Sequence, residues 1–316
     1  MIEIDPRSAF LATPAWSWLA SALATAAAVL AFARVAAPLG LVDAGGGVGL
    51  HRTERGANLR LVGGLALALG VAFATWTEPA TREDASWRTL LALLAALLVG
   101  LADDGAHGGL SPRAKLALQA LPALAFACWN ETPLSSAPLF AFAAAVAAQN
   151  VVNTYDNADG VLLASAALAF APVRPAWSAV ALAVLAFNLR PRGRANVLLG
   201  DSGSHLIALM LLSEPRAWGA FLVPALDLAR LRFVRRAQGR GWWVGDRAHL
   251  AHRLQARGLA PIPVVLVLLG VAAPAIFGVA LFDAPLAWAC GLAASSLAFL
   301  VAVRATPAVD GHGKPL

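Results

Sequence analysis

Five acidic residues stand at the ends of apolar segments of the chain. They are Asp103, Asp104, Asp156, Asp159 and Asp201. Ionising neighbouring carboxylates at the end of an apolar run is costly unless a cation or hydrogen-bond donors compensate the charge. Carboxylate and amide oxygens without cysteine suit Mg²⁺ or Mn²⁺ better than zinc. The acids therefore predict a site for a hard divalent cation.

Basic and histidine side chains lie in the same polar segments as these acids. The candidates are His51, Arg60, Lys115, Arg247, His249 and His252. Arginine and lysine bind phosphate oxygens, which a divalent cation would bridge. The two histidines near the end are three residues apart, so they share a helix face and can bind phosphate or carry protons. Acids for a metal and bases for phosphate together predict phosphoryl transfer.

Each motif also has a purely structural explanation. An isolated pair such as Asp103–Asp104 can snorkel into water and end a helix. The polar residues of segment 153–159 can share a helix face or cap a helix start before Gly160. Segment 201–204 can be a simple N-cap, or it can let a diphosphate approach backbone amides. The occurrence of all these motifs in alternate loops favours the functional interpretation.

The composition places the chain in a membrane. Of its 316 residues, 59% are hydrophobic and 13% charged, and the mean hydropathy is +0.69. A soluble domain is about a quarter charged, so this chain lacks the polar residues for a water-facing surface. The apolar runs are continuous rather than alternating, which predicts helices and not a barrel. We expect an all-α, polytopic transmembrane helical bundle.

We predict about 10–11 membrane spans in a single domain covering residues 1–316. The spans lie near 13–34, 61–76, 88–102, 115–129, 137–150, 161–172, 175–189, 201–213, 217–231, 262–282 and 285–303. Several are shorter than the ~20 residues that cross a bilayer, so we expect tilted or tightly bundled helices with small residues between them. The largest cytoplasmic loop is predicted at 232–258.

Lysine and arginine concentrate in alternate loops. The basic loops contain Arg52, Arg55 and Arg60; Arg113 and Lys115; Arg190, Arg192 and Arg194; and seven arginines between 232 and 257. The positive-inside rule puts these loops in the cytoplasm and the N-terminus outside. We expect a multi-pass protein of the inner membrane. Its net charge of +6 then reflects topology and contact with headgroups or phosphates, with no nucleic acid partner.

Taken in order, the motifs resemble those of the polyprenyl-phosphate N-acetylhexosamine-1-phosphate transferase superfamily (glycosyltransferase family 4). The resemblance covers about residues 45–260. Segment 103–119 is similar to the aspartate-pair loop, 150–160 to Asn-x-x-Asn-x-x-Asp-Gly-x-Asp-Gly, and 200–204 to Gly-Asp-x-Gly-Ser. Segment 224–249 is similar to the ninth span and histidine loop. That loop looks closer to the branch that initiates teichoic acid and O-antigen than to phospho-MurNAc-pentapeptide translocase.

The resemblance implies transfer of a sugar-1-phosphate from a UDP-sugar to a polyprenyl (undecaprenyl) phosphate, with release of UMP. We expect N-acetylhexosamine as the sugar, Mg²⁺ or Mn²⁺ as cofactor, and a role as the first membrane step of a cell-envelope glycan pathway. The implied partners are the UDP-sugar donor, the polyprenyl phosphate acceptor and membrane lipids. A homodimer is left open as the assembly.

The resemblance also implies a role for each acidic motif. By motif position, Asp201 is the metal ligand, with Asn153 beside it. Asp103 and Asp104 would hold or deprotonate the acceptor phosphate. Asp156 would orient the polar network.

Donor recognition is assigned in the same way. Lys115 and Asp159 would approach the uracil. Arg247, His249 and His252 would face the diphosphate or the sugar. The chemical task is electrostatic, because two anionic substrates must be held in line while charge develops on the leaving UMP.

Three positions depart from the family pattern and leave other functions open. Asn157 replaces a glycine, Leu198 an aromatic residue, and Ala251 a histidine. They motivate the alternative of an inactive relative that only scaffolds other enzymes. A membrane transporter is a further alternative, although transporters usually place charges and broken helices near mid-membrane. Substituting Asp201 would abolish the function of an enzyme and leave a scaffold working.

Overall fold

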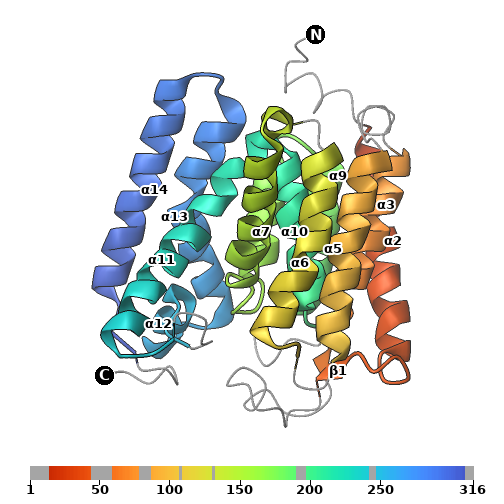
Figure 1. Ribbon diagram of the computed structural model, residues 1–316, viewed down its shortest axis with the longest axis horizontal. Coiled ribbons are helices and arrows are strands. Elements are labelled where there is room, and N and C mark those ends of the chain that lie inside the picture. Colours follow the sequence, from red (N-terminus) through yellow and green to blue (C-terminus); the bar gives the residue numbers. More distant parts are fainter. Residues whose placement is uncertain are drawn as a thin grey trace.

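The computed structural model shows a bundle of α-helices (Figure 1). It describes residues 14–43, 59–77, 87–106, 109–129, 132–189, 197–241 and 247–309. The helices are α2 (Ala15–Val35), α3 (Gly63–Thr77), α5 (Trp87–Gly105), α6 (Pro112–Trp129), α7 (Pro138–Asn153), α8 (Val161–Phe170), α9 (Pro175–Asn188), α10 (Gly200–Ser213), α11 (Leu222–Ala237), α12 (Leu250–Ala256), α13 (Pro261–Leu281) and α14 (Pro285–Ala305). Two 3₁₀ helices are η1 (Pro133–Ser136) and η2 (Pro215–Phe221). The predicted all-α polytopic membrane fold is confirmed.

Every predicted span coincides with helix in the structure. The ninth, 217–231, is divided between η2 and α11, because the chain is 3₁₀ up to Phe221 before the α-helix begins. The segment 232–258 is less of a loop than predicted, since α11 continues to Ala237 and α12 occupies Leu250–Ala256. A polar composition conceals helix when the helix lies at the membrane surface or against charged partners.

Three helices, α2, α13 and α14, are long and apolar enough to cross a membrane by length and composition. The apolar helices α3, α7, α8 and α9 are shorter, with 10–17 residues. Ten residues of helix rise about 15 Å, which is half of a ~30 Å hydrocarbon core. The number of spans and their orientation stay predictions.

Helix α10 lies inside the bundle and packs against α3, α5 and α7. Each of its residues from Ser202 to Leu212 is buried. A helix that is apolar on all sides is typical of one enclosed by other helices. The polar residues at its start therefore lie in the middle of one end of the bundle.

Glycines let two neighbouring helices approach the start of α10. A Cβ on Gly64 of α3 would lie 2.3 Å from Ser202 Oγ, and one on Gly100 of α5 would lie 2.2 Å from Ser202 Cα. Both distances exclude a side chain, so only glycine permits this approach. Helices α3 and α5 thus hold the first turn of α10 from two sides.

A short strand pair, which the sequence did not predict, precedes α3. Strand β1 (Val42–Asp43) pairs antiparallel with β2 (Leu59–Arg60). The backbone of Arg60 also bridges to Val197, and Leu198 N donates to Arg60 O at 2.8 Å. The strand pair therefore supports the segment that leads into α10.

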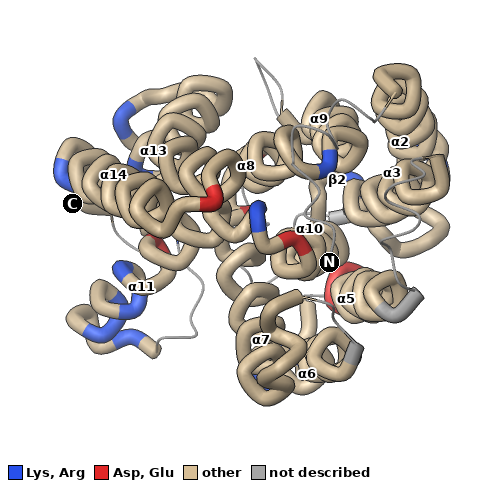
Figure 2. Tube along the Cα trace, turned by 90° about the horizontal axis from the view of Figure 1, so that it is seen from above, with Lys and Arg blue, Asp and Glu red and all other residues tan. Residues whose placement is uncertain are grey.

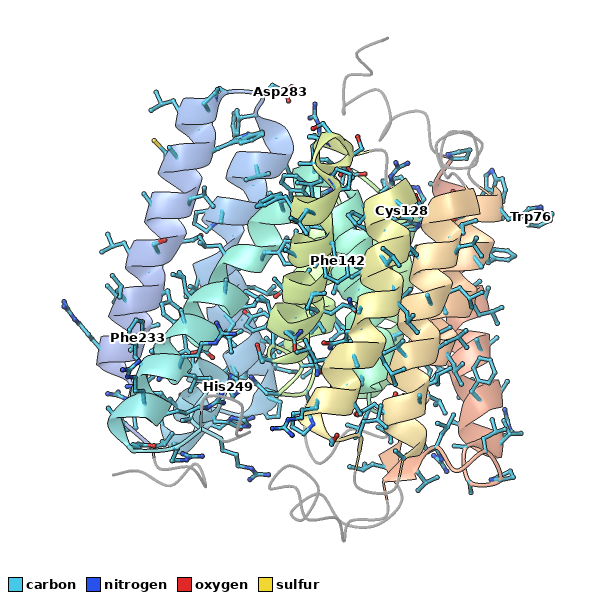
Figure 3. All side chains as sticks on the ribbon, in the orientation of Figure 1. Trp76, Cys128, Phe142, Phe233, His249 and Asp283 are labelled. Atoms are coloured by element: carbon cyan, nitrogen blue, oxygen red, sulfur yellow. The ribbon has the colours of Figure 1, made fainter. Side chains whose placement is uncertain are left out.

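Charged residues are sparse along the helices and gather near their ends and on α11 (Figure 2). His249 lies toward one end of the bundle and Asp283 lies at the opposite end (Figure 3). On α14, large apolar side chains such as Leu286, Trp288 and Leu300 are exposed. Such a face is compatible with lipid rather than water.

Candidate active site

Four helix ends meet at the start of α10 and bring three charged side chains together. Lys115, in the first turn of α6, forms an ion pair with Asp201 of α10. Its Nζ also lies 3.7 Å from Asp103 Oδ2, in the last turn of α5. Lys115 is 86 positions from Asp201 in the chain and Asp103 is 98 positions from it, yet the three side chains share one site.

Asn153, the last residue of α7, completes this group. Its amide nitrogen donates to Asp201 Oδ1 at 3.0 Å, and its oxygen accepts from Lys115 Nζ at 2.8 Å. The orientation of the amide is assigned from the donors and acceptors around it. Asp103, Lys115, Asn153 and Asp201 are hereafter called the acidic cluster.

Asp104 caps the N-terminus of α10. Its two carboxylate oxygens accept from the backbone N–H of Asp201 at 2.9 Å and of Ser202 at 3.0 Å. Gly200 turns the chain with a φ of 74°, and a Cβ there would lie 2.5 Å from Asp104 Oδ2. A carboxylate at this place satisfies free N–H groups and interacts favourably with the helix dipole. Asp104 therefore fixes the backbone of Asp201, and its predicted contact with an acceptor phosphate stays a prediction.

Asp103 is held by the turn that follows it. Its Oδ1 accepts from Leu110 N at 2.8 Å, and the turn closes through Gly109 with a φ of 77°. The residue is buried, with 6% of its surface exposed. Its other oxygen is the one that faces Lys115, so the turn aims the carboxylate into the acidic cluster.

The turn between α7 and α8 carries Asp156 and Asp159, both half-buried. It ends at Gly160, whose N–H donates to Asn188 Oδ1 at 2.6 Å. Asn188, at the end of α9, also donates to Val197 O at 3.0 Å. This buried amide ties the turn to the segment before α10. It was not among the predicted site residues, and its only signal in the sequence is a single amide ending an apolar run.

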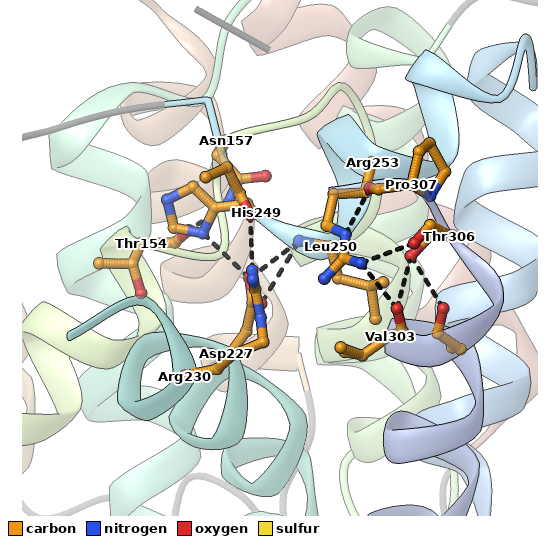
Figure 4. A network of polar contacts seen from close by, with 12 residues as sticks. Thr154, Asn157, Asp227, Arg230, His249, Leu250, Arg253, Val303, Thr306 and Pro307 are labelled. Carbon is orange, nitrogen blue, oxygen red and sulfur yellow. Dashed lines mark hydrogen bonds and ion pairs between the residues drawn. The ribbon is translucent and has the colours of Figure 1, made fainter. Parts of the chain in front are cut away.

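A second group of polar contacts surrounds His249 (Figure 4). Asp227 of α11 is buried and its Oδ2 lies 3.0 Å from His249 Nδ1. Its Oδ1 accepts from Arg230 at 2.8 Å, and Leu250 N also donates to it. The pair places the hydrogen on Nδ1 and leaves Nε2 of His249 for another partner. Asp227 lies in segment 224–249, which resembles the family's ninth span and histidine loop, but it is not one of the predicted site residues.

Arg253 joins the histidine segment to the last helix. Its guanidinium donates to the carbonyl oxygens of Val303, Thr306 and Pro307 at 2.7, 2.6 and 2.8 Å. Carbonyls at a helix C-terminus have no partner within the helix, so a buried arginine satisfies them. Burial lowers the pKa of Arg253, and the neighbouring positive charge of Arg230 acts in the same direction.

The remaining candidates are placed differently. The ring of His252 lies 6.0 Å from that of His249, and Arg247 is half-buried nearby in the chain. Arg60 is exposed and its backbone belongs to β2. His51 lies outside the described residues. Between the acidic cluster and the His249 group, the described part of the chain has no direct hydrogen bond.

Residues 86–213 match glycosyl transferase family 4. This segment runs from α5 to α10 and contains the whole acidic cluster with Asp104, Asp156 and Asp159. The match supports the resemblance to the glycosyltransferase family 4 superfamily and to its phospho-sugar transfer reaction. It does not distinguish the branch, and the His249 group lies beyond the matched residues. No curated protein matches the chain.

The expected divalent cation is chemically compatible with the residues at this site. Among the described residues, no three or more His, Cys, Asp or Glu side chains are grouped to hold a metal. Mg²⁺, however, commonly takes one or two carboxylates and completes its shell with water and phosphate oxygens. Asp201, Asn153 and Asp103 have oxygen atoms of that type, and these now accept from or face Lys115, so a bound cation would take the place of its ammonium group. The predicted ligand pair is therefore chemically suitable.

Proposed function

We propose that this protein transfers N-acetylhexosamine-1-phosphate from a UDP-sugar to a polyprenyl phosphate and releases UMP. The observation that carries the proposal is the acidic cluster at the start of α10, which joins carboxylate, amide and ammonium groups within the segment that matches family 4. The product would serve as the first lipid-linked intermediate of a cell-envelope glycan.

The reaction forms one P–O bond and breaks another. An oxygen of the acceptor phosphate attacks the sugar-linked phosphorus, and the bond from that phosphorus to the UMP oxygen breaks. When bound, Mg²⁺ would neutralise charge on the diphosphate oxygens. Lys115, which lies between the Asp103 and Asp201 carboxylates, would add positive charge to the site in place of the uracil contact expected for it, and Asp103 would orient the acceptor or take its proton.

His249 is a second group that would bind the donor by a hydrogen bond. Asp227 accepts from its Nδ1, so the ring orientation is fixed and Nε2 is the nitrogen that would bind a ligand. An oriented ring of this kind can bind the donor diphosphate without losing rotational freedom on binding. The lipid tail of the acceptor can remain in the bilayer while the nucleotide arrives from water, because the site lies at one end of the bundle.

The decisive experiment measures UMP release and formation of a lipid-soluble sugar product. Detergent-purified protein receives undecaprenyl phosphate, Mg²⁺ and UDP-activated GlcNAc, GalNAc, QuiNAc or FucNAc in turn. We expect product with one donor, its loss with EDTA, and a drop of about 10²- to 10³-fold in Asp201→Asn. The donor that works names the sugar.

A matched control is Ser178→Ala, which removes a buried hydrogen bond to Ala167 O far along the chain from the cluster. It should keep normal turnover. Folded protein that gives no product with any donor, beside an active family 4 enzyme, would contradict the proposal. Normal cellular function of Asp201→Asn would instead favour a scaffold, and uptake of solute into sealed vesicles would favour a carrier.

A further inference from the structure

A chain of polar side chains lies inside the bundle, one helical turn deeper than the acidic cluster. It consists of Gln119 on α6, Asn150 on α7 and His205 on α10, and is hereafter called the buried relay. Gln119 and His205 are fully buried. Polar groups at such depth are costly unless they are hydrogen-bonded, so their contacts are specific.

The contacts form a continuous path across three helices. Asn150 Nδ2 donates to Gln119 Oε1 at 2.9 Å and to Val146 O at 2.8 Å. Gln119 Nε2 lies 3.1 Å from His205 Nε2. Gln149 supports the path, because its Nε2 donates to the backbone oxygen of Gln119 at 3.2 Å.

The path determines the form of His205. An amide nitrogen only donates, so Gln119 Nε2 requires an acceptor at His205 Nε2. With the Gln119 amide oriented by its bond from Asn150, the ring is neutral and carries its hydrogen on Nδ1, which has no hydrogen-bond partner among the described residues. An imidazolium would bring two donors face to face in a buried place. His205 thus accepts a hydrogen bond from the Gln119 amide, which an apolar residue at this position could not do.

Each member of the buried relay sits one turn from a member of the acidic cluster. Gln119 follows Lys115 by four residues on α6, and His205 follows Asp201 by four on α10. Asn150 precedes Asn153 by three on α7. Residues at these spacings share a helix face, so the relay ties together the three turns that carry the cluster.

We propose that His205 is a positioning residue that sets the register of α6, α7 and α10, and thereby the separation of Lys115, Asn153 and Asp201. The inference rests on the proposed function of that cluster. His205 lies outside the Gly-Asp-x-Gly-Ser pattern, which ends at Ser204, and its hydrogen-bond partner is Gln119. Its effect passes through Gln119 and Asn150.

The first test is spectroscopic and needs no activity. In ¹⁵N-histidine-labelled protein, the ring signals that vanish in His205→Gln belong to His205. We expect a neutral ring with hydrogen on Nδ1, and a shift of its Nε2 signal in Gln119→Leu. A charged ring, or hydrogen on Nε2, would overturn the relay.

The second test follows the position of Asn153. In ¹⁵N-asparagine-labelled protein, its side-chain amide signal should move in His205→Leu and return in His205→Gln, whose amide oxygen can accept from Gln119. Ser178→Ala should leave the signal in place. An unmoved Asn153 signal in folded His205→Leu would refute the positioning role, whether or not the protein proves to be a transferase.

The third test is kinetic. We expect turnover to fall roughly 10- to 100-fold in His205→Leu, as for small misplacements of reacting groups. The Mg²⁺ concentration for half-maximal activity should rise, and His205→Gln should restore both values to within about threefold. If His205→Leu does not fold, the double variant with Gln119→Leu removes both polar partners, and Asn150 Nδ2 loses its bond to Gln119 but keeps the one to Val146 O. Wild-type turnover and Mg²⁺ dependence in either folded variant would overturn the inference.

Discussion

At the scale of single residues, carboxylates of the same type do different work because their partners differ. Asp104 accepts from two backbone N–H groups, whereas Asp103 accepts from one and faces an ammonium. Asp227 accepts from a histidine and an arginine. Asp104 caps α10, and Asp227 also accepts from Leu250 N at the start of α12. Asp103 and Asp227 in addition each face a charged or titratable neighbouring side chain.

We predict that Asp227→Asn lowers turnover about 10- to 100-fold, because an amide cannot hold His249 and Arg230 as a carboxylate does. The same change leaves a partly buried arginine without its charge partner. Initial-rate measurements of UMP release would test this, with Asp283→Asn as control, since Asp283 is an exposed partner of Arg216 at the other end of the bundle. Equal rates in both variants would contradict an orienting role for Asp227.

At the scale of elements, α10 packs closely against α5 and α3. Helix α5 places Gly100 against Ser202, and α3 places Gly64 against the same residue. The acidic cluster depends on these approaches because Asp103 and Asp201 come from these helices. A side chain at the contact would separate the two carboxylates.

We predict that Gly100→Ala destabilises the protein by about 1–3 kcal/mol, or prevents folding, because its Cβ would overlap the α10 backbone. Gly270→Ala is the matched control: Gly270 also lies within a helix, and nothing stands within 4 Å of its added Cβ. That control should be neutral or stabilising by up to about 1 kcal/mol. Thermal unfolding in detergent compares the two, and equal melting temperatures would show that the helices can separate without cost.

A second prediction at this scale concerns the end of α14. Arg253→Met keeps much of the side-chain volume but removes the donors to three carbonyl oxygens. We expect faster protease cleavage near α12 and a loss of about 1–3 kcal/mol per buried group left unpaired. Limited proteolysis with a protease that does not cleave at arginine would measure the cleavage rate. Arg257→Met, which changes an exposed neighbour, is the control. Identical cleavage patterns would mean that the contacts do not hold the segment.

At the scale of the whole molecule, α10 has polar groups at both of its ends. The acidic cluster lies at its start, and Glu214, which follows its last residue, pairs with Arg174 at 3.1 Å. Arg216, just after α10, pairs with Asp283 at the opposite end of the bundle from His249 (Figure 3), so the start of α10 and the histidine segment share one end. Arg235 and Arg236 are in the last turn of α11, which ends beside α12 (Figure 1). The distribution is the one that the positive-inside rule interprets as cytoplasmic.

We predict that a cysteine at Gln238 reacts with a membrane-impermeant maleimide only after cells are permeabilised, whereas one at Ala284 reacts in intact cells. Both positions are exposed. The background lacks the two native cysteines, Cys128 and Cys290. The physical reason is that arginine-rich loops are retained on the cytoplasmic side. The reverse pattern of labelling would invert the predicted topology.

The amino-acid sequence alone determined the apolar helices and their order, but not α12, which lies in the segment predicted as a loop. Apolar runs of given length must form helices in lipid, because every backbone N–H and C=O needs a partner within the segment. Spacing rules such as three and four residues also identified candidates within single motifs, for example His249 with His252. These rules reach one turn along the chain and no farther.

Tertiary structure decided which candidates meet. Asp104 caps α10, whose first acidic residue is 97 positions away in the chain. Asn188 joins the turn before α8 to the segment before α10. The buried relay from Asn150 to His205 could not be predicted from the sequence either, because its two hydrogen bonds join residues that are 31 and 86 positions apart in the chain. Such contacts depend on how glycines let helices pack, which no local pattern encodes. Hydropathy and motif order therefore predict the bundle and its chemistry, and only packing assigns each polar side chain its partner.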